Sequence, residues 1–354
     1  MPAVAPLASS PITAASANLP RVLVMGTGSV GGFVGGSLQA VGVPVQFVAR
    51  PRMALALREH GLVLTDLQGQ RLTLPAAELQ VLDRLPASGP PPELVLLAVK
   101  SGATAEAAAQ LAAALAPGTP VLSLQNGIGN AALGAQLAPG LCWLPGMVPY
   151  NIAELGPGRL HRGTGGRLAA QDHPVLRRLQ PACERAGLGL KLHADLAPVQ
   201  WGKLLLNLNN PVNAMSGLPL RAELLDVGYR RLFAALQLEA LKVLRAAGIQ
   251  PAQVASLPPH RLARLMQLPN WIFTRLAGRM LNIDEKARSS MADDLALGRA
   301  TEIDALCGEV CRLAARHQVA APLNARMLAL VEAWPQRRKP WPAAELQRAV
   351  AGRG

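Results

Sequence analysis

The sequence has few aromatic residues, few cysteines and no long hydrophobic run. Aromatic side chains make up 3% of the 354 residues although 50% are hydrophobic, so a core must be built from leucine, valine and alanine. The four cysteines show no Cys/His spacing typical of a zinc site, and they suit a reducing, cytoplasmic compartment. No run of about 18 apolar residues is present, which argues against a membrane-spanning helix. We therefore expect a globular protein with no metal site and no membrane segment.

Acidic residues are scarce relative to basic ones. The chain carries 35 Lys and Arg against 22 Asp and Glu, a formal net charge of +13. Such an excess could serve nucleic-acid binding, but the basic residues are mostly single arginines, and aromatic side chains that stack on bases are scarce. We interpret the excess as an arginine-rich composition and expect no nucleic-acid partner. A basic surface would still attract a phosphorylated cofactor or an anionic acid.

The length exceeds what one hydrophobic core usually holds, which predicts two domains. Residues 1–20 have neither a basic start nor a sustained apolar segment, and we expect a disordered leader there. Residues 21–194 alternate short apolar runs with helical stretches, the pattern of an α/β domain with a Rossmann-type doubly wound parallel sheet. The expected strands cover 22–25, 44–49, 93–100 and 120–126, and the expected helices cover 30–41 and 104–116.

Residues 195–354 follow a helical period with long Leu/Ala stripes, so an all-helical C-terminal domain is expected beyond a boundary near Ala194. Within it, residues 289–304 are expected to lie on one helix. Two Gly/Pro clusters of the first domain, at 87–92 and 154–166, are expected to form surface turns.

The stretch RVLVMGTGSVGGFVGG, residues 21–36, places six glycines within eleven residues. Its GTGSVG part is Gly-x-Gly-x-x-Gly directly after an expected strand and at the start of a helix. The first glycine makes a tight turn, the second lets backbone approach a pyrophosphate, and the third lets helix and strand pack closely. Free N–H groups at the helix start then bind phosphate oxygens. We predict a dinucleotide site, with a tight turn that binds no ligand as the alternative. The predicted residues are Gly26, Thr27, Gly28, Ser29, Val30 and Gly31.

The end of the next expected strand distinguishes two nicotinamide cofactors. NAD sites usually place Asp or Glu there, whereas this chain has Arg50. A guanidinium suits the 2′-phosphate, so NADPH is favoured over NADH. Lys100 and Asn126 lie in loops after two further expected strands, where ligands bind in such sheets. Each of these residues could instead be an ordinary solvated or turn residue.

The helical domain offers a candidate proton donor. Lys203 and Asn207 are four residues apart and share a helix face, and Asn210 follows closely. A lysine among tryptophan and leucine residues can be desolvated, lose its proton more readily and act as a general acid. A lysine that snorkels from an amphipathic helix is an equally good interpretation.

A second polar group lies in the expected helix 289–304. Ser290, Asp294 and Glu302 fall within an arc of roughly 120° if each residue turns the helix by about 100°. This arc could line a cleft that faces the first domain, or it could be a hydrated helix face. The sequence shows no Ser/His/Asp triad, so a nucleophilic hydrolase has no support.

These residues carry a resemblance to the ketopantoate reductase (2-dehydropantoate 2-reductase) family. Four blocks match over roughly residues 21–335, namely GTGSVGG, QNGIG, WGKLLLNLNNPVNA and ARSSMADDLALGRATEID. The resemblance implies an NADP-dependent oxidoreductase that reduces a small 2-oxo acid, 2-dehydropantoate, to pantoate on the pantothenate route.

The resemblance also implies roles for single residues. Lys203 matches the catalytic lysine that protonates the forming alkoxide, and Glu302 matches the acid that orients this lysine and the substrate. Further matches to substrate-binding positions are Asn126, Asn207, Ser290 and Asp294, and matches to the NADPH site are Gly26, Gly28, Gly31, Arg50, Lys100 and Asn126.

The chain departs from the family pattern at two places. The family's second asparagine usually stands eight residues after the lysine, where this chain has Pro211, and Asn210 comes one residue earlier. Residues 268–287 look like an insertion before Ser290 that could reshape the pocket.

Several alternatives stay open at this point. The substrate could be another 2-oxo acid, or the enzyme could be an opine-type dehydrogenase that joins an amine to a keto acid. A non-catalytic NADPH-binding sensor would keep the same fold. A homodimer is a possible assembly.

Overall fold

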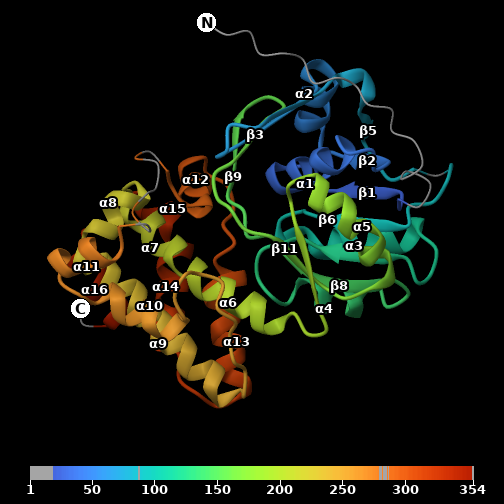
Figure 1. Cartoon of the computed structure of the whole chain (residues 1–354). Coiled ribbons are helices and arrows are strands. Elements are labelled where there is room, and N and C mark those ends of the chain that lie inside the picture. Colours follow the sequence, from blue (N-terminus) through green and yellow to red (C-terminus); the bar gives the residue numbers. More distant parts are fainter. Residues whose placement is uncertain (1–18, 87, 279–280, 282–284, 286, 353–354) are drawn as a thin grey trace, which may run out of the picture.

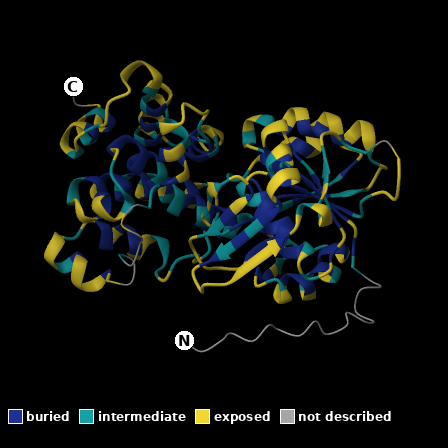
Figure 2. Cartoon of the chain, turned by 90° about the horizontal axis from the view of Figure 1, so that it is seen from above, coloured by how far each residue is buried: buried dark blue, intermediate teal, exposed yellow. Residues whose placement is uncertain are grey.

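The structure is a computed structural model that describes residues 19–352, apart from residues 87, 279–280, 282–284 and 286. Most of the expected leader 1–20 therefore lies outside the described residues. The described chain forms a sheet half, residues 19–193, and a helical half, residues 197–352, which lie side by side in Figure 1. Figure 2 shows buried strands at the centre of the sheet half and exposed outer faces on its helices.

An eight-stranded sheet runs through the sheet half in the order β12-β11-β8-β7-β6-β1-β2-β5. Neighbouring strands are parallel except for the antiparallel pair β11 and β8, which confirms the expected doubly wound parallel sheet. The four expected strands are confirmed as β1, β2, β6 and β7. The bounds are β1 Val22–Met25, β2 Val45–Val48, β5 Gln80–Leu82, β6 Leu94–Leu97, β7 Pro120–Ser123, β8 Cys142–Met147, β11 Leu168–Gln171 and β12 Leu190–His193.

Alternate residues of β1 face two different cores. Val22 and Val24 pack on the side of helices α1, α2 and α5, whereas Leu23 and Met25 pack on the side of α3. A strand that is covered on both faces needs apolar side chains at every position, and the sequence VLVM of β1 meets this requirement. The helices of this half are α1 Ser29–Gln39, α2 Pro51–His60, α3 Thr104–Ala114, α4 Asn130–Leu137 and α5 Pro174–Arg185, with short 3-10 turns η2 Ala76–Glu78 and η3 Ser101–Ala103.

A second, four-stranded sheet was not expected. Its order is β4-β3-β10-β9, with β4 Arg71–Leu74, β3 Leu62–Asp66, β10 Arg159–Arg162 and β9 Ile152–Gly156. The prediction of surface turns over 154–166 was wrong for residues 154–156 and 159–162, which belong to β9 and β10, whereas residues 163–166 lie in no strand. Gly156 and Gly158 adopt φ of +137° and +65° where β9 turns into β10 as a hairpin.

Helix α1 lies between the two sheets, which explains the glycines beyond the turn. It contacts β1 and β2 on one side and β3, β9 and β10 on the other. A Cβ on Gly35 would lie 2.6 Å from a ring carbon of Phe47, and one on Gly36 would lie 2.4 Å from Leu62 Cδ2. Larger side chains would therefore force the sheets apart.

The helical half contains one large core. Buried residues of α6, α7, α9, α10, α12, α13, α14 and α16 form a single cluster, which includes Trp201, Phe233 and Met327. The bounds are α6 Ala197–Asn207, α7 Asn209–Ser216, α8 Leu220–Leu225, α9 Val227–Ala246, α10 Pro259–Met266, α11 Asn270–Leu276, α12 Ser290–Ala296, η4 Asp304–Gly308, α13 Glu309–Arg316, α14 Pro322–Glu332, α15 Trp334–Arg337 and α16 Ala343–Ala351.

The expectation of one helix over 289–304 was wrong. Helix α12 ends at Ala296, and Gly298 then adopts φ of +63°, a conformation that continues no right-handed helix. Helical structure resumes as the π-helical turn η4 at Asp304. Ser290 and Asp294 therefore lie on α12, while Glu302 lies on the connection to η4.

A buried carboxyl group anchors the junction of α6 and α7. Asn209, the first residue of α7, donates from Nδ2 to Glu223 Oε2 of α8 at 3.0 Å. Glu223 is fully buried, and burial raises the pKa of its carboxyl group to about 8. Since Asn209 stands between Asn207 and Asn210, this contact helps to fix both flanking side chains.

Glu223→Gln tests the protonation of this carboxyl group. An unfolded glutamate ionises near pH ~4.3, so between that pH and pH 8 only the folded protein retains the proton, and the free energy of unfolding of the native protein falls as pH rises. Glutamine has no such proton. At pH 8 the melting temperature of the variant should be roughly 2–6 °C above that of the native protein. At pH 5 the two melting temperatures should be nearly equal.

Thermal unfolding at both pH values is the measurement, with the exposed Glu332→Gln as control. An equal shift in melting temperature at pH 5 and pH 8 would show that Glu223 is ionised in the fold.

Candidate functional site

The glycine-rich turn has the backbone that a dinucleotide needs. Gly26 adopts φ of +97°, in the left-handed region that favours glycine. A Cβ on Gly31 would lie 2.3 Å from the carbonyl oxygen of Gly26, so α1 approaches the turn too closely for any side chain there. A Cβ on Gly28 would meet no heavy atom within 4 Å, which leaves open space beside the backbone. The three glycines thus occupy three different environments, and they fit a bound pyrophosphate.

The other residues of the turn have distinct positions. Thr27 is buried, and its amide and hydroxyl donate to the carbonyl oxygen of Val48 at 3.3 and 2.9 Å, which ties the turn to β2. Ser29 and Val30 begin α1, where the first N–H groups of a helix have no partner within the helix. The contacts of these residues with a cofactor stay a prediction.

The end of β2 carries arginines and no acid. Arg50 is exposed at the start of α2 and forms no ion pair with a residue that the structure describes. Arg52 is held by Glu154 of β9 through two bonds of 2.8 and 3.1 Å, and this contact lowers the pKa of the Glu154 carboxyl group. The guanidinium of Arg50 could bind a 2′-phosphate, and the preference for NADPH over NADH stays a prediction.

A chain of three side chains joins the two halves. Lys203 of α6 donates from Nζ to Asn126 Oδ1 at 2.8 Å. Asn126, in the loop between β7 and α4, donates from Nδ2 to Glu302 Oε2 at 2.9 Å. A carboxylate accepts only and an ammonium donates only, so the two ends fix which way the amide of Asn126 points.

The predicted substrate-binding residues line one pocket between the halves, although the helix expected to carry three of them is interrupted. Asn210 lines it together with Asn207, which lies on the preceding helix. The lining residues are Asn126, Asn207, Asn210, Ser290, Met291, Asp294, Glu302 and Leu306. A second hollow shares Asn207 and is lined by Gln125, Gly127, Gly146, Met147, Gln200, Lys203, Leu204 and Asn207.

The environment of Lys203 is unusual for a lysine. Burial lowers the pKa of its ammonium group to about 8, and the negative charge of Glu302 opposes this shift. Lys203 is half-buried, and its Nζ binds Asn126 of the opposite half, so the desolvated lysine is favoured over the snorkelling one. Three N–H bonds belong to the ammonium, so one can bind Asn126 while the others remain for a ligand.

Lys100 contacts the helical half. Its Nζ donates to Asp294 Oδ1 at 2.7 Å and to the carbonyl oxygen of Ala300 at 3.1 Å. Asp294 is thus paired in this structure, and the predicted cofactor contact of Lys100 stays a prediction. The exposed position of Lys100 keeps this ion pair accessible to solvent.

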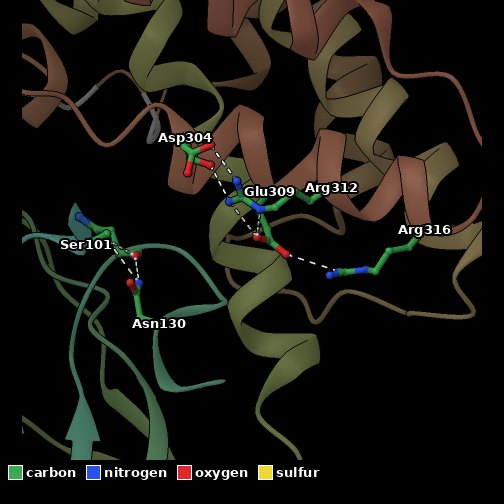
Figure 3. A network of polar contacts seen from close by, with 7 residues as sticks. Ser101, Asn130, Asp304, Glu309, Arg312 and Arg316 are labelled. Carbon is green, nitrogen blue, oxygen red and sulfur yellow. Dashed lines mark hydrogen bonds and ion pairs between the residues drawn. The ribbon is translucent and has the colours of Figure 1, made fainter. Parts of the chain in front are cut away.

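Sequence reasoning missed two residues beside Glu302. Ser101 donates to Glu302 Oε1 from its amide at 3.3 Å and can donate from Oγ at 3.1 Å. Asn130 of α4 donates from Nδ2 to Ser101 Oγ at 3.3 Å and to the carbonyl oxygen of Asn126 at 2.7 Å. Figure 3 shows Ser101 and Asn130 facing each other. The only sequence signal for Ser101 was its place directly after Lys100.

The π-helical turn next to Glu302 is braced by charged groups. Arg312 donates to Asp304 Oδ1 at 2.7 Å and to Glu309 Oε2 at 3.0 Å, and Arg316 lies 3.6 Å from the other oxygen of Glu309 (Figure 3). A Cβ on Gly308 would lie 2.3 Å from Asp304 Oδ1, so a larger residue there would displace the Asp304 carboxylate from its present position beside Arg312. Such turns widen a helix locally and often lie at functional sites.

Two other kinds of site receive no support within the described residues. No group of three or more His, Cys, Asp or Glu side chains there could hold a metal ion. No described helix has both the length and the apolar character to cross a bilayer.

Comparison with known proteins gives consistent matches. The family model "Ketopantoate reductase PanE/ApbA" matches residues 22–174, and the model of its C-terminal part matches residues 195–334. A 2-dehydropantoate 2-reductase of Halobacterium salinarum is 28% identical over 319 residues, covering 88% of this chain and 97% of the relative. One of Mesorhizobium japonicum is 27% identical over 338 residues, covering 88% and 96%.

A solved structure extends the similarity to the fold. The crystal structure of a PanE/ApbA family ketopantoate reductase from Ralstonia eutropha has a TM-score of 0.75 and 27% sequence identity to this chain. The match covers 90% of this chain and 99% of that one. Both the sheet half and the helical half are therefore shared with that protein.

Two glycine variants separate ligand approach from packing. Gly28→Ala adds a methyl group in open space, so the fold should melt as the native protein does while the dissociation constant for NADPH rises about tenfold or more. Gly31→Ala pushes a methyl group against backbone and should lower the melting temperature itself. Fluorescence titration and thermal unfolding measure the two effects. Unchanged NADPH binding by Gly28→Ala would remove this turn from the cofactor site.

Proposed function

Because the chain belongs to the ketopantoate reductase family, we propose that it reduces 2-dehydropantoate to pantoate with NADPH. It is an oxidoreductase by that membership. The observation that carries the proposal is the hydrogen-bonded series Lys203–Asn126–Glu302. It links the half-buried ammonium of Lys203, which lines the second hollow, to two residues that line the pocket between the halves. We also propose that residues 21–194 hold the cofactor and that residues 195–354 hold the substrate.

The cofactor would be held by the glycine-rich turn, with Arg50 on the 2′-phosphate and with Lys100 and Asn126 nearer the pocket. When bound, NADPH supplies a hydride to C2 of the 2-oxo acid. Arg50 is favoured as the phosphate contact because it is exposed and forms no ion pair with a described residue, whereas Arg52 is paired with Glu154.

Lys203 would do two things in the reaction. Its positive charge stabilises the negative charge that develops on the carbonyl oxygen, and its proton then converts the alkoxide to the hydroxyl group. With a pKa of about 8 it is mostly protonated at pH 7, yet it releases a proton more readily than a solvated lysine. Asn126 and Glu302 would keep the ammonium aimed at the pocket.

The polar residues of the pocket would hold the substrate. Ser290 would bind near the carboxylate, and Asn207 and Asn210 would bind the other oxygens. Asn210 follows Lys203 by seven residues but lies on α7, beyond the break between α6 and α7 at Leu208, and it lines the same pocket as Asn207. The asparagine one position early can thus serve the pocket.

The direct test is NADPH oxidation with 2-dehydropantoate beside branched, straight-chain and aromatic 2-oxo acids, each with and without an added amine. The proposal expects the highest kcat/KM with 2-dehydropantoate and no dependence on the amine. A higher kcat/KM with another acid would reassign the substrate, and a requirement for the amine would indicate an opine-type enzyme. Binding of NADPH without turnover of any acid would contradict a reductase.

Arg50→Ala tests the choice of cofactor. The loss of a charge-assisted bond to phosphate should raise the KM for NADPH by about 10- to 100-fold and leave the KM for NADH unchanged. Arg58→Ala is a matched control, because Arg58 pairs with Asp83 elsewhere in the same half. An equal loss with both cofactors would argue against a role in phosphate recognition.

Lys203→Ala tests the proton donor. The variant should bind NADPH as the native enzyme does, while turnover falls by a factor on the order of 10² or more. Lys242→Ala, which removes an exposed lysine of α9, should leave turnover unaltered. If Lys203→Ala retained full turnover, another group would have to supply the proton.

A further inference from the structure

We infer that Ser101 is a positioning residue, through which the sheet half holds the carboxylate of Glu302 and thereby aims the ammonium of Lys203. The inference rests on the proposed function, because it concerns the proton donor of that reaction. Ser101 contacts two residues of the pocket lining directly. Its amide and Oγ lie within hydrogen-bond distance of Glu302 Oε1, and its Oγ also lies 3.1 Å from the carbonyl oxygen of Asn126.

Both oxygens of the Glu302 carboxylate are bound from the sheet half. Oε1 lies 3.3 Å from the amide nitrogen of Ser101 and 3.1 Å from its Oγ, while Oε2 accepts from Asn126 Nδ2 at 2.9 Å. Glu302 itself lies on the irregular connection between α12 and the π-helical turn, where no regular helix fixes its backbone. The orientation of its carboxylate therefore depends on donors from the opposite half.

The direction of these bonds carries the effect to Lys203. Since Glu302 accepts a hydrogen bond from Asn126 Nδ2, the oxygen of the same amide, Oδ1, faces Lys203 and accepts a hydrogen bond from its ammonium. A carboxylate that moved away would free the amide to rotate, and the ammonium would lose a fixed acceptor. Ser101 thus stands at the start of the ordered series Ser101, Glu302, Asn126, Lys203.

A buried polar network holds Ser101 in place. Thr104 donates from Oγ1 to the carbonyl oxygen of Ser101 at 2.7 Å and accepts from Gln125 Nε2 at 2.9 Å, and Asn130 Nδ2 lies 3.3 Å from Ser101 Oγ. Thr104, Gln125 and Asn130 are all buried. Buried polar groups that satisfy one another are rigid, because each would be costly to leave unpaired. This network gives Ser101 a fixed position from which to hold a residue of the other half.

Ser101→Ala removes the hydroxyl and keeps the amide contact. We expect kcat to fall about 5- to 20-fold, because the ammonium of Lys203 would be less well oriented toward the substrate. KM should stay within about threefold of the native value. Since the charge of Glu302 supports the charged form of Lys203, the alkaline limb of the kcat profile should move to lower pH. Ser101→Thr keeps the hydroxyl, so both kcat and the pH at which kcat declines on the alkaline side should match those of the native protein.

The control is Thr119→Ala, which removes a hydroxyl that donates to the carbonyl oxygen of Ala116 in the same half. It should change neither kcat nor the pH profile. If Ser101→Ala lowered only the melting temperature, or if Ser101→Thr failed to restore kcat, the role of Ser101 would be merely structural and the inference would be wrong.

A double-mutant cycle with Glu302→Gln decides whether Ser101 acts through Glu302. In the Glu302→Gln background, Ser101→Ala should cause no further loss of kcat, and the denaturant midpoint of the double variant should match that of Glu302→Gln alone. If Ser101→Ala lowered kcat by the same factor in the native and the Glu302→Gln protein, and both proteins were active, the inference would be wrong. A native protein that reduces no 2-oxo acid would overturn the proposed function, and the inference with it.

Discussion

The loss of hydration around a lysine ammonium must be compensated by hydrogen bonds and opposite charge, and the candidate site depends on the groups that supply them to Lys203. Burial alone would drive Lys203 toward its neutral form. The opposing charge of Glu302 comes from the same half of the molecule, but the amide that joins the two, Asn126, comes from the other half. The hydrogen-bonded series that holds Lys203, the proposed proton donor, therefore needs residues of both the sheet half and the helical half.

The glycines of helix α1 and of the turn before it meet two separate physical requirements. Its turn leaves open space beside Gly28 for a ligand, while further along Gly35 and Gly36 let Phe47 and Leu62 approach the helix axis. The first demand concerns a cofactor and the second concerns packing between two sheets. The density of glycines thus exceeds what a dinucleotide motif requires, because the helix is enclosed on both sides.

The sequence was informative where structure follows local rules. Strand β1 was predicted to the residue, since a continuous apolar run is what a strand buried on both faces requires. The hairpin of β9 and β10 was missed, because its strands are short and its glycines resemble a loop. The helix predicted over 289–304 breaks after Ala296, yet Ser290, Asp294 and Glu302 still line one pocket. Periodicity could not distinguish a buried from a snorkelling Lys203, nor find Ser101, since both depend on contacts between distant segments.

The most direct measurement of the central claim is an NMR titration of the ¹⁵N-labelled Nζ of Lys203 in the native protein and in Glu302→Gln. We expect this group to titrate near pH 8 in the native protein and at a lower pH in the variant, because the variant keeps the burial of Lys203 and loses the charge of Glu302. Titration near the value of a solvated lysine, about 10.4, in both proteins would contradict it.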